Sequence, residues 1–520
     1  ASAARAAADH SKFAELKGPF RSGPQVTRAC LRCHPDAARQ VQDTAHWTWL
    51  GEPQHVPGHA GTVRIGKANL LNNFCIGVRS NMGHCGECHV GYGWTGKPEK
   101  SWRTYDFKQA ANVDCLACHD TSGDYSRDPS WGAPDWGEAA RSAGPTSIHS
   151  CGSCHFNGGG GAGVKHGDLD PTLEEADVRL DVHMAKDGLG YTCSSCHGGD
   201  PSAHKIRGLA AGLSVVTGEV TCVGCHGDAP HGRRSIARGA LETAGAKRLG
   251  VAEADRWSWQ DSVLNSHTRS IACETCHVPT YARRRATQMW WDWSKAGRHT
   301  PDWRAVSTFD KDGDYSYRGI MGSFRWAKDP VPEYRWYDGR EGRYLTGDTF
   351  DPSKVLVFNP PEGGPSVAGS KIWPFKVHRG VQPYDAVYKT LIQPNVWGPR
   401  GSGAYWSDFD WQAAARKGMK AAGLPFSGKI AFARTDMYWP LTHMVVGGDH
   451  ALQCAQCHAR DGRLAGVPGV YIPGESRSRT LDVLGLAALL ATLMGVAAHA
   501  VLRGTGGLGG RVGAGGKEES

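Results

Sequence analysis

The chain has 520 residues and a formal net charge of +8, and only 40% of it is hydrophobic, while 69 residues are glycine and 28 are proline. This composition predicts many turns and loops joined by short helices. No block of five or six like charges occurs, which excludes an arm for binding nucleic acid or another polyanion.

One short pattern, Cys-x-x-Cys-His, occurs eight times and uses sixteen of the seventeen cysteines. Two thiols at this spacing form thioethers to a porphyrin and the adjacent histidine ligates its iron, so the pattern is the attachment signature of a c-type haem. A disulfide framework or a set of zinc sites would not require a histidine after every second cysteine. The motifs are Cys30-Cys33-His34, Cys85-Cys88-His89, Cys115-Cys118-His119, Cys151-Cys154-His155, Cys193-Cys196-His197, Cys222-Cys225-His226, Cys273-Cys276-His277 and Cys454-Cys457-His458.

Eight c-type haems would account for both the charge and the composition. Each haem brings two propionates, and ferric iron in a porphyrin dianion leaves one positive charge, so the basic excess of the protein offsets the cofactors. With about 65 residues per haem, the porphyrins would replace much of the usual side-chain core. We therefore expect a multihaem cytochrome c fold, mainly α-helical and irregular, with a haem-packed core.

The motifs divide the chain unevenly. After an N-terminal segment at 1–29, residues 30–277 hold seven motifs, residues 278–453 hold none, and residues 454–475 carry the eighth. The haem-free insert is rich in tryptophan, and we expect these rings to pack against porphyrin faces and propionates.

One segment near the end of the chain is apolar enough to cross a membrane. Residues 481–502 would span about 33 Å as a helix, and a glycine-rich tail at 503–520 follows; a buried core helix is the alternative. Because haem is attached outside the cytoplasm, we expect the haem-bearing body on the periplasmic or outer face and the tail in the cytoplasm. The chain begins at Ala1 without a methionine, which predicts that a secretory signal has been removed.

The second axial ligand of each iron must come from outside the motifs. Sixteen histidines lie outside the motifs, and His499 is excluded as a ligand because it lies in the membrane segment. The remaining histidines outnumber the eight irons, so their number alone does not show which of them are ligands. An iron held by two histidines transfers electrons, whereas an iron with a displaceable ligand can bind a substrate.

The segments around the motifs resemble the octahaem tetrathionate reductase family over about residues 25–460. The likeness includes DTAHWTW at 43–49, NNFCI at 72–76, VKHGDLD at 164–170 and WDWSKAG at 291–297. The C-terminal apolar segment departs from the soluble members of that family.

In that family the second haem has a lysine as its distal ligand and is the active site. The resemblance implies that the haem on Cys85, Cys88 and His89 has Lys165 as distal ligand. An amine must lose its proton to bind iron, and a displaced ammonium can hold an anionic substrate. The resemblance also implies that Cys75 lies near this haem, where its thiolate could attack a polythionate sulfur. Ala162 stands where the family has an acidic residue, which leaves the substrate preference open.

The resemblance and the positions in the chain imply a further set of distal ligands, for which His166, His378 and His450 are the nearest competitors. The set is His46, His149, His183, His204, His231, His267 and His443.

The resemblance implies a membrane-anchored periplasmic reductase that passes two electrons to tetrathionate at the Lys165 site and releases two thiosulfates. A quinol dehydrogenase or a membrane cytochrome is the expected electron donor. Two other functions stay open. One is an octahaem enzyme that converts nitrite or hydroxylamine, although no Cys-x-x-Cys-Lys motif occurs. The other is an electron-transfer conduit without substrate chemistry.

Overall fold

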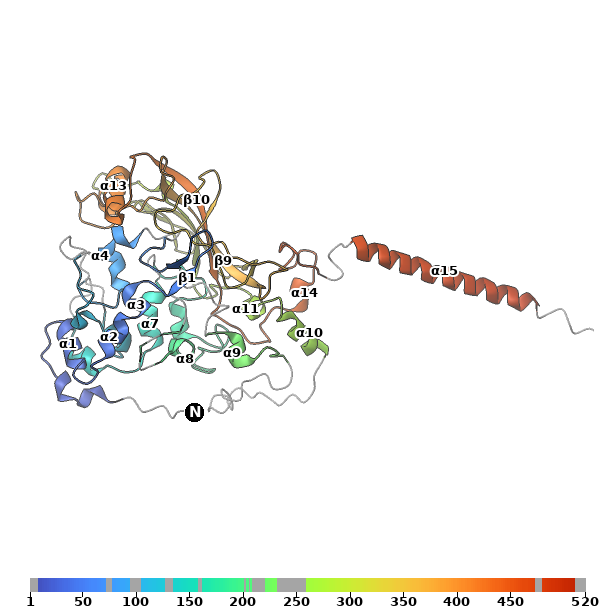
Figure 1. The fold of residues 1–520 in the computed structure, drawn as a ribbon, viewed down its shortest axis with the longest axis horizontal. Coiled ribbons are helices and arrows are strands. Elements are labelled where there is room, and N and C mark those ends of the chain that lie inside the picture. The colour runs from blue at the N-terminus through green and yellow to red at the C-terminus, as the bar shows by residue number, and fades with distance from the viewer. Residues whose placement is uncertain are drawn as a thin grey trace, which may run out of the picture. The chain divides into compact units, whose positions relative to one another are not determined.

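The computed structural model forms two compact units, Ala1–Leu452 and Gln453–Ser520, and each is treated by itself. Figure 1 traces the chain, and within the first unit it shows β10 and α13 at one end and the helices α1, α2, α8 and α9 towards the other. The residues described are 8–71, 77–93, 104–126, 134–157, 161–200, 203–204, 206–207, 220–231, 259–472 and 479–509.

Short helices carry the haem motifs in the first unit. Serine or threonine caps precede several of them: the Ser147 hydroxyl accepts a hydrogen bond from the backbone N–H of Ser150 in α7, and Thr221 caps α9 in the same way. The α-helices of this region are α1 (Gly23–Cys30), α2 (Ala37–Gln42), α3 (Ala45–Thr48), α4 (Met82–Cys85), α5 (Leu116–His119), α6 (Trp136–Arg141), α7 (Ile148–His155), α8 (Cys193–His197), α9 (Cys222–His226), α10 (Trp259–His267) and α11 (Cys273–His277).

Short 3-10 helices and one hairpin complete this region. The hairpin joins β1 (Pro53–His55) to β2 (Thr62–Arg64) in antiparallel register. The 3-10 helices are η1 (His10–Lys12), η2 (Ala14–Leu16), η3 (Val78–Ser80), η4 (Gly86–Cys88), η6 (Ala110–Asn112) and η8 (Pro171–Glu175).

The haem-free insert folds as an eight-stranded sheet in the order β4-β5-β6-β3-β9-β10-β8, with β7 paired to β9. The pairs β3–β9 and β10–β8 are parallel and the others are antiparallel. The sequence predicts a mainly α-helical and irregular multihaem cytochrome c fold. The sheet in the insert is a feature that this prediction lacks. The strands are β3 (Thr287–Asp292), β4 (Ser307–Phe309), β5 (Tyr315–Arg318), β6 (Gly322–Ala327), β7 (Glu333–Tyr337), β8 (Leu356–Val357), β9 (Lys371–Asp385) and β10 (Ile430–Pro440), and η10 (Trp293–Lys295) follows β3.

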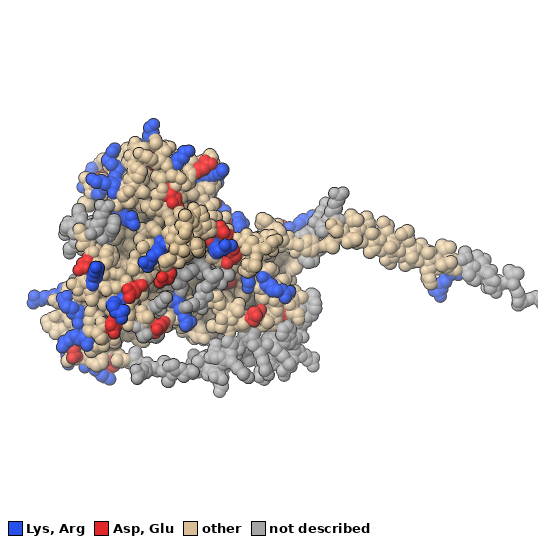
Figure 2. Space-filling view, in the orientation of Figure 1, with Lys and Arg blue, Asp and Glu red and all other residues tan. Residues whose placement is uncertain are grey.

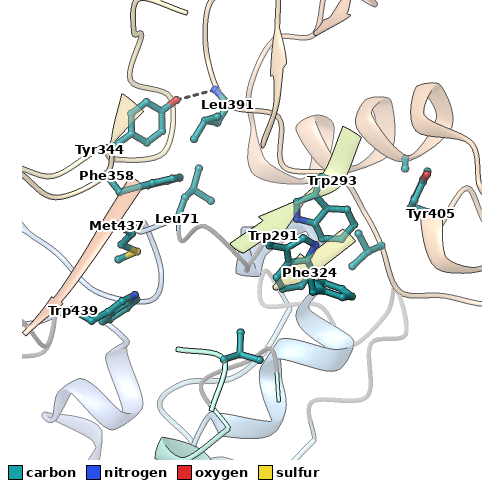
Figure 3. Close-up of a cluster of buried hydrophobic side chains, with 13 residues drawn as sticks. Leu71, Trp291, Trp293, Phe324, Tyr344, Phe358, Leu391, Tyr405, Met437 and Trp439 are labelled. Carbon is teal, nitrogen blue, oxygen red and sulfur yellow. Dashed lines mark hydrogen bonds between the residues drawn. The ribbon is translucent and has the colours of Figure 1, made fainter. Parts of the chain in front are cut away.

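Aromatic side chains fill the core of the insert (Figure 3). Trp291 and Trp293 stack with ring centroids 5.0 Å apart, and both are buried together with Trp439 of β10. The Tyr344 hydroxyl accepts a hydrogen bond from the backbone N–H of Leu391 at 2.8 Å. These three tryptophans share a core with Leu71 and Val164 from outside the insert, and their contact with porphyrins stays a prediction.

Two helices close one end of the sheet, α12 (Tyr405–Asp408) and α13 (Trp411–Ala422). The Asp410 carboxylate accepts hydrogen bonds from the first free N–H groups of α13, and Gly423 ends the helix with a φ of +76°. Tyr405 and Ala414 bury their side chains in the same aromatic core.

The second unit holds α14 (Cys454–Cys457), which carries the eighth motif, and α15 (Arg479–Gly509). Within α15, Thr480–Gly504 has a mean hydropathy of 2.1 and is, among the described helices, the one long and apolar enough to cross a membrane. Figure 2 shows this helix as a largely uncharged rod, whereas basic and acidic side chains are intermixed on the visible face of the first unit.

Candidate haem and redox site

In six places the structure brings the histidine of a motif opposite a histidine from outside the motifs. The ring centroids lie 6.0 to 6.4 Å apart in every case. The pairs are His34 with His10, His119 with His204, His155 with His46, His197 with His443, His226 with His183, and His277 with His231.

This spacing fits a metal between the two rings. Bonds of about 2 Å from a metal to the nearest nitrogen on each side put the ring centroids roughly 6 Å apart. Ordinary ring packing covers a wider range, about 4.5–7 Å, and has no reason to choose one motif histidine and one other histidine each time. The six sites therefore have the donor set and the spacing that bis-histidine haems require.

The orientation of the motif histidines supports the same conclusion. A backbone carbonyl oxygen that accepts from Nδ1 leaves Nε2 without a proton and directed at a metal. Three motif histidines have such a partner: His119 with Gly144 at 2.9 Å, His197 with Arg207 at 3.1 Å, and His277 with Val446 at 2.9 Å.

The opposing histidines are oriented in a similar way by side-chain oxygens. Their Nδ1 atoms face an amide or a carboxylate, which again leaves Nε2 for the metal. The contacts join His204 to Gln40 at 2.6 Å, His231 to Asn265 at 3.2 Å, and His443 to Asp168 at 3.4 Å.

The first cysteines of certain motifs touch one another. Among the described motif cysteines, three pairs of first cysteines lie close enough to perturb one another. Because each cysteine would hold one edge of a porphyrin, these contacts group the first haem with the third, the fourth with the fifth, and the sixth with the seventh. The pairs are Cys30 with Cys115, Cys151 with Cys193, and Cys222 with Cys273.

The second motif has a different geometry. His89 is 1% exposed, and its Nε2 lies 2.7 Å from the carbonyl oxygen of Trp47. Its ring is also close to Trp47 and Trp49, with centroids 4.9 and 5.2 Å away. The segments 72–76 and 94–103, which flank the motif, lie outside the described residues.

Lys165 lies within the group of haem-site residues. Its Nζ is 5.0 Å from the ring centroid of Trp439. Burial first, and then the charges of His46, Lys165, His197 and Lys67, together lower the pKa of His155 to about 3. Lys67 in turn reaches the second motif, because its Nζ is 3.5 Å from the carbonyl oxygen of Cys85. Lys165 is thus close to the fourth haem site, and α3 links that site to the second motif through His46 and Trp47.

The other predicted ligands differ in where they lie. His149 has a 57% exposed side chain with Nδ1 3.3 Å from Glu174, and it is His10, absent from the predicted set, that lies opposite His34. His267 is the last residue of α10. Cys75 lies outside the described residues, and its predicted role stays a prediction. His10 precedes the first motif in a short 3-10 helix, and no local pattern marks it as a ligand.

The competing histidines have other surroundings. His378 is fully buried in β9, and its Nε2 is 3.2 Å from the Gln288 side-chain oxygen. His166 packs its ring on Trp439 with centroids 4.9 Å apart, and burial lowers its pKa well below the usual value. His450 has a half-exposed side chain beside Asp449.

Comparison with known proteins agrees with this geometry. Residues 288–461 match the family described as bacterial cytochrome c. An uncharacterised protein of Archaeoglobus fulgidus is 26% identical over 248 aligned residues, which cover 37% of this chain and 78% of that protein. The crystal structure of an octahaem cytochrome c from Shewanella oneidensis is 37% identical, covers 89% of this chain and 97% of its own, and superposes with a TM-score of 0.73. The chain therefore belongs to the octahaem c-type cytochromes, and it carries c-type haems.

Proposed function

We propose that this cytochrome is a membrane-anchored, extracytoplasmic reductase in which Lys165 is the distal ligand of the haem on Cys85, Cys88 and His89, and that its substrate is tetrathionate. The observation that supports this most directly is the position of the Lys165 amine, which lies 5.0 Å from the ring centroid of Trp439 beside His166. When bound, c-type haems supply one-electron transfers, and an iron with a displaceable ligand supplies a place for the substrate.

The remaining haems are proposed as bis-histidine electron carriers. The ring pairs support His10, His46, His183, His204, His231 and His443 as distal ligands. We place His10 in the position expected for His149, since His10 faces a motif histidine and His149 faces Glu174. His267 is retained as a proposed distal ligand.

Lys165 would have two roles at the second haem. As a neutral amine it would ligate the iron, and as an ammonium it would hold the tetrathionate dianion. Trp439 favours the ammonium form, because the face of an indole ring attracts a cation within about 6 Å. Tetrathionate takes up two electrons from the reduced haems, its central sulfur–sulfur bond breaks, and two thiosulfates leave. We also propose that the Cys75 thiolate attacks one of these sulfurs first, which would release one thiosulfate before the electrons arrive.

The electrons would come from a membrane partner that oxidises quinol. The apolar helix Thr480–Gly504 supports a location beside the quinone pool, and haem attachment outside the cytoplasm supports an extracytoplasmic body.

Reoxidation of the fully reduced protein by tetrathionate tests the proposal, with haem absorbance followed in time and thiosulfate assayed afterwards. Rapid reoxidation with two thiosulfates per tetrathionate is expected. Lys165→Met should reduce the reoxidation rate at least about tenfold, because it removes one charge-assisted contact with the substrate. Lys186→Met is the matched control, because Lys186 is an exposed lysine paired with the exposed Glu175. Haems that stay reduced in the wild-type protein would contradict the proposal.

A conduit without substrate chemistry is the second candidate, and the six bis-histidine pairs favour it because such irons have no displaceable ligand. The same experiment separates the candidates. Reoxidation by nitrite or hydroxylamine alone would favour a nitrogen-oxide enzyme, and reoxidation by none of the three would favour the conduit.

A further inference from the structure

Lys376, in the middle of β9, is a fully buried lysine with no role in the reaction described so far. Its side chain is 0% exposed, and burial lowers its pKa well below the usual value. Its Nζ donates to the backbone carbonyl oxygens of Val164 at 2.8 Å and Lys165 at 3.0 Å, and to the Thr287 hydroxyl at 2.6 Å. Three acceptors therefore surround the buried nitrogen, two of them backbone carbonyl oxygens.

The acceptors of Lys376 belong to the segment that carries the proposed ligand. We call residues 161–168 the Lys165 loop. Thr287 of β3 extends the contact by donating to the carbonyl oxygen of Gly163 at 2.6 Å, and the backbone N–H of Gln288 donates to the same oxygen at 3.1 Å. Three consecutive carbonyl groups of the loop, at 163, 164 and 165, are thus held by the sheet.

Trp439 makes the neighbouring contact from β10. It is paired directly with Lys376 in the β9–β10 register, and it contacts both the Lys165 amine and the His166 ring. Lys376 therefore fixes the backbone of the loop, while Trp439 contacts the side chains that this backbone presents.

The backbone of the Lys165 loop packs tightly against the start of β3. Gly163 has a φ of +73°, and a Cβ at this position would come within 2.9 Å of the carbonyl oxygen of Ala286. The strand and the loop can approach this closely only because residue 163 is glycine.

We propose that Lys376 is a positioning residue, which fixes the backbone of Lys165 so that the Lys165 amine reaches the second haem. The inference rests on the proposed function, since it takes Lys165 to be the ligand. An apolar side chain of the same length would fill the volume but would remove the donor that Nζ provides to the Val164 and Lys165 carbonyl oxygens. In this proposal the haem-free insert positions the distal ligand of a haem that is attached elsewhere in the chain.

Lys376→Met in the haem-loaded full-length protein tests the inference. The control is Val377→Ala, the next residue of β9, which is equally buried but packs in a different cluster with Phe375 and Trp373. Two readouts are needed: amide hydrogen exchange of peptides covering 161–168, and the electron paramagnetic resonance signal of the oxidised haems. For Lys376→Met we expect exchange in the loop to become about tenfold faster and the signal of the lysine-ligated haem to be lost. Neither change is expected for Val377→Ala.

The spectrum of Lys165→Ala separates the two proposals. If Lys165→Ala leaves the haem signals unchanged, Lys165 is not a ligand and the proposed function fails, whereas the exchange data still decide whether Lys376 fixes the loop. Unchanged exchange in Lys376→Met, or faster exchange with the lysine-ligated signal intact, would overturn the inference.

Discussion

Asp168 and His443 join the Lys165 loop to the segment that follows β10. The Oδ2 of Asp168 lies 3.4 Å from Nδ1 of His443, and it also accepts hydrogen bonds from the backbone N–H groups of Thr442 and His443 at 2.7 and 2.9 Å. Burial alone would raise the pKa of Asp168, but the hydrogen bond and charge of His443 lower it. The carboxylate is therefore ionised beside a proposed distal ligand, and it connects the Lys165 loop to His443, which lies opposite His197.

This contact predicts a change in one redox potential. A carboxylate that accepts from Nδ1 makes the imidazole a stronger donor and stabilises ferric iron, so Asp168→Asn should raise the midpoint potential of the haem between His197 and His443. We expect a rise on the order of 60 mV, which corresponds to a tenfold change in a one-electron equilibrium. A potentiometric titration resolved by electron paramagnetic resonance measures it.

Asp170→Asn is the control for this potential. Asp170 is buried in the same segment, but its carboxylate accepts from the backbone and hydroxyl of Thr172 rather than from a histidine. An equal rise in both variants would mean that loss of a nearby charge, and not the contact with His443, sets the potential.

A pair of histidine variants tests the ligand of the first haem. His10→Ala removes the ring opposite His34, so one haem of the eight should change from low spin to high spin and bind added imidazole. His149→Ala should leave the spectrum unchanged, because His149 faces solvent and Glu174. The visible spectrum of the oxidised protein, with and without imidazole, gives both results. A high-spin haem in His149→Ala alone would reverse the assignment.

The sequence was sufficient for the motif ligands because their chemistry is local: the spacing of Cys193, Cys196 and His197 contains the whole attachment site. The opposing ligands depend on tertiary structure. His10 lies 24 positions before His34 in a 3-10 helix, and the two rings meet only because the chain turns back between them. Local spacing therefore gave no reason to prefer it to His149.

The role of Lys376 also depends on tertiary structure and could not be predicted from the sequence. A lysine among the alternating residues of a strand usually faces solvent, and only the Lys165 loop, more than 200 positions earlier in the sequence, makes it a buried donor. The sheet itself had a usable signal, since Ile372, Phe375, Val377, Val381 and Tyr384 form a run rich in β-branched and aromatic residues.

Glu341 predicts a pH dependence of stability. Burial raises the pKa of this carboxyl to about 7 although Arg343 and Asn359 contact it. The folded protein therefore retains a proton that the unfolded chain releases above about pH 4.5, and the stability contributed by this group is lost as the pH rises from 4.5 through 7. The loss is on the order of 3 kcal/mol.

Denaturant unfolding between pH 5 and 8, followed by tryptophan fluorescence, checks this slope. Glu341→Gln mimics the protonated acid, so its unfolding free energy should stay nearly constant over the range in which the wild-type value falls. Glu175→Gln, which changes an exposed carboxylate, should retain the wild-type slope. A wild-type protein that becomes more stable towards pH 8 would show that Arg343 keeps Glu341 ionised.

The α15 helix predicts a depth-dependent effect of charge on membrane binding. Leu493 lies near the middle of Thr480–Gly504, where an arginine costs about 2.5–3.5 kcal/mol on insertion scales. Leu502 lies near the end of the same segment, where an arginine side chain reaches the interface at little cost. Leu493→Arg should therefore shift the protein from the membrane fraction towards the soluble fraction, and Leu502→Arg should leave it in the membrane. Carbonate extraction followed by haem staining measures the partition. If both variants stay in the membrane fraction, another part of the protein or a partner provides the anchor.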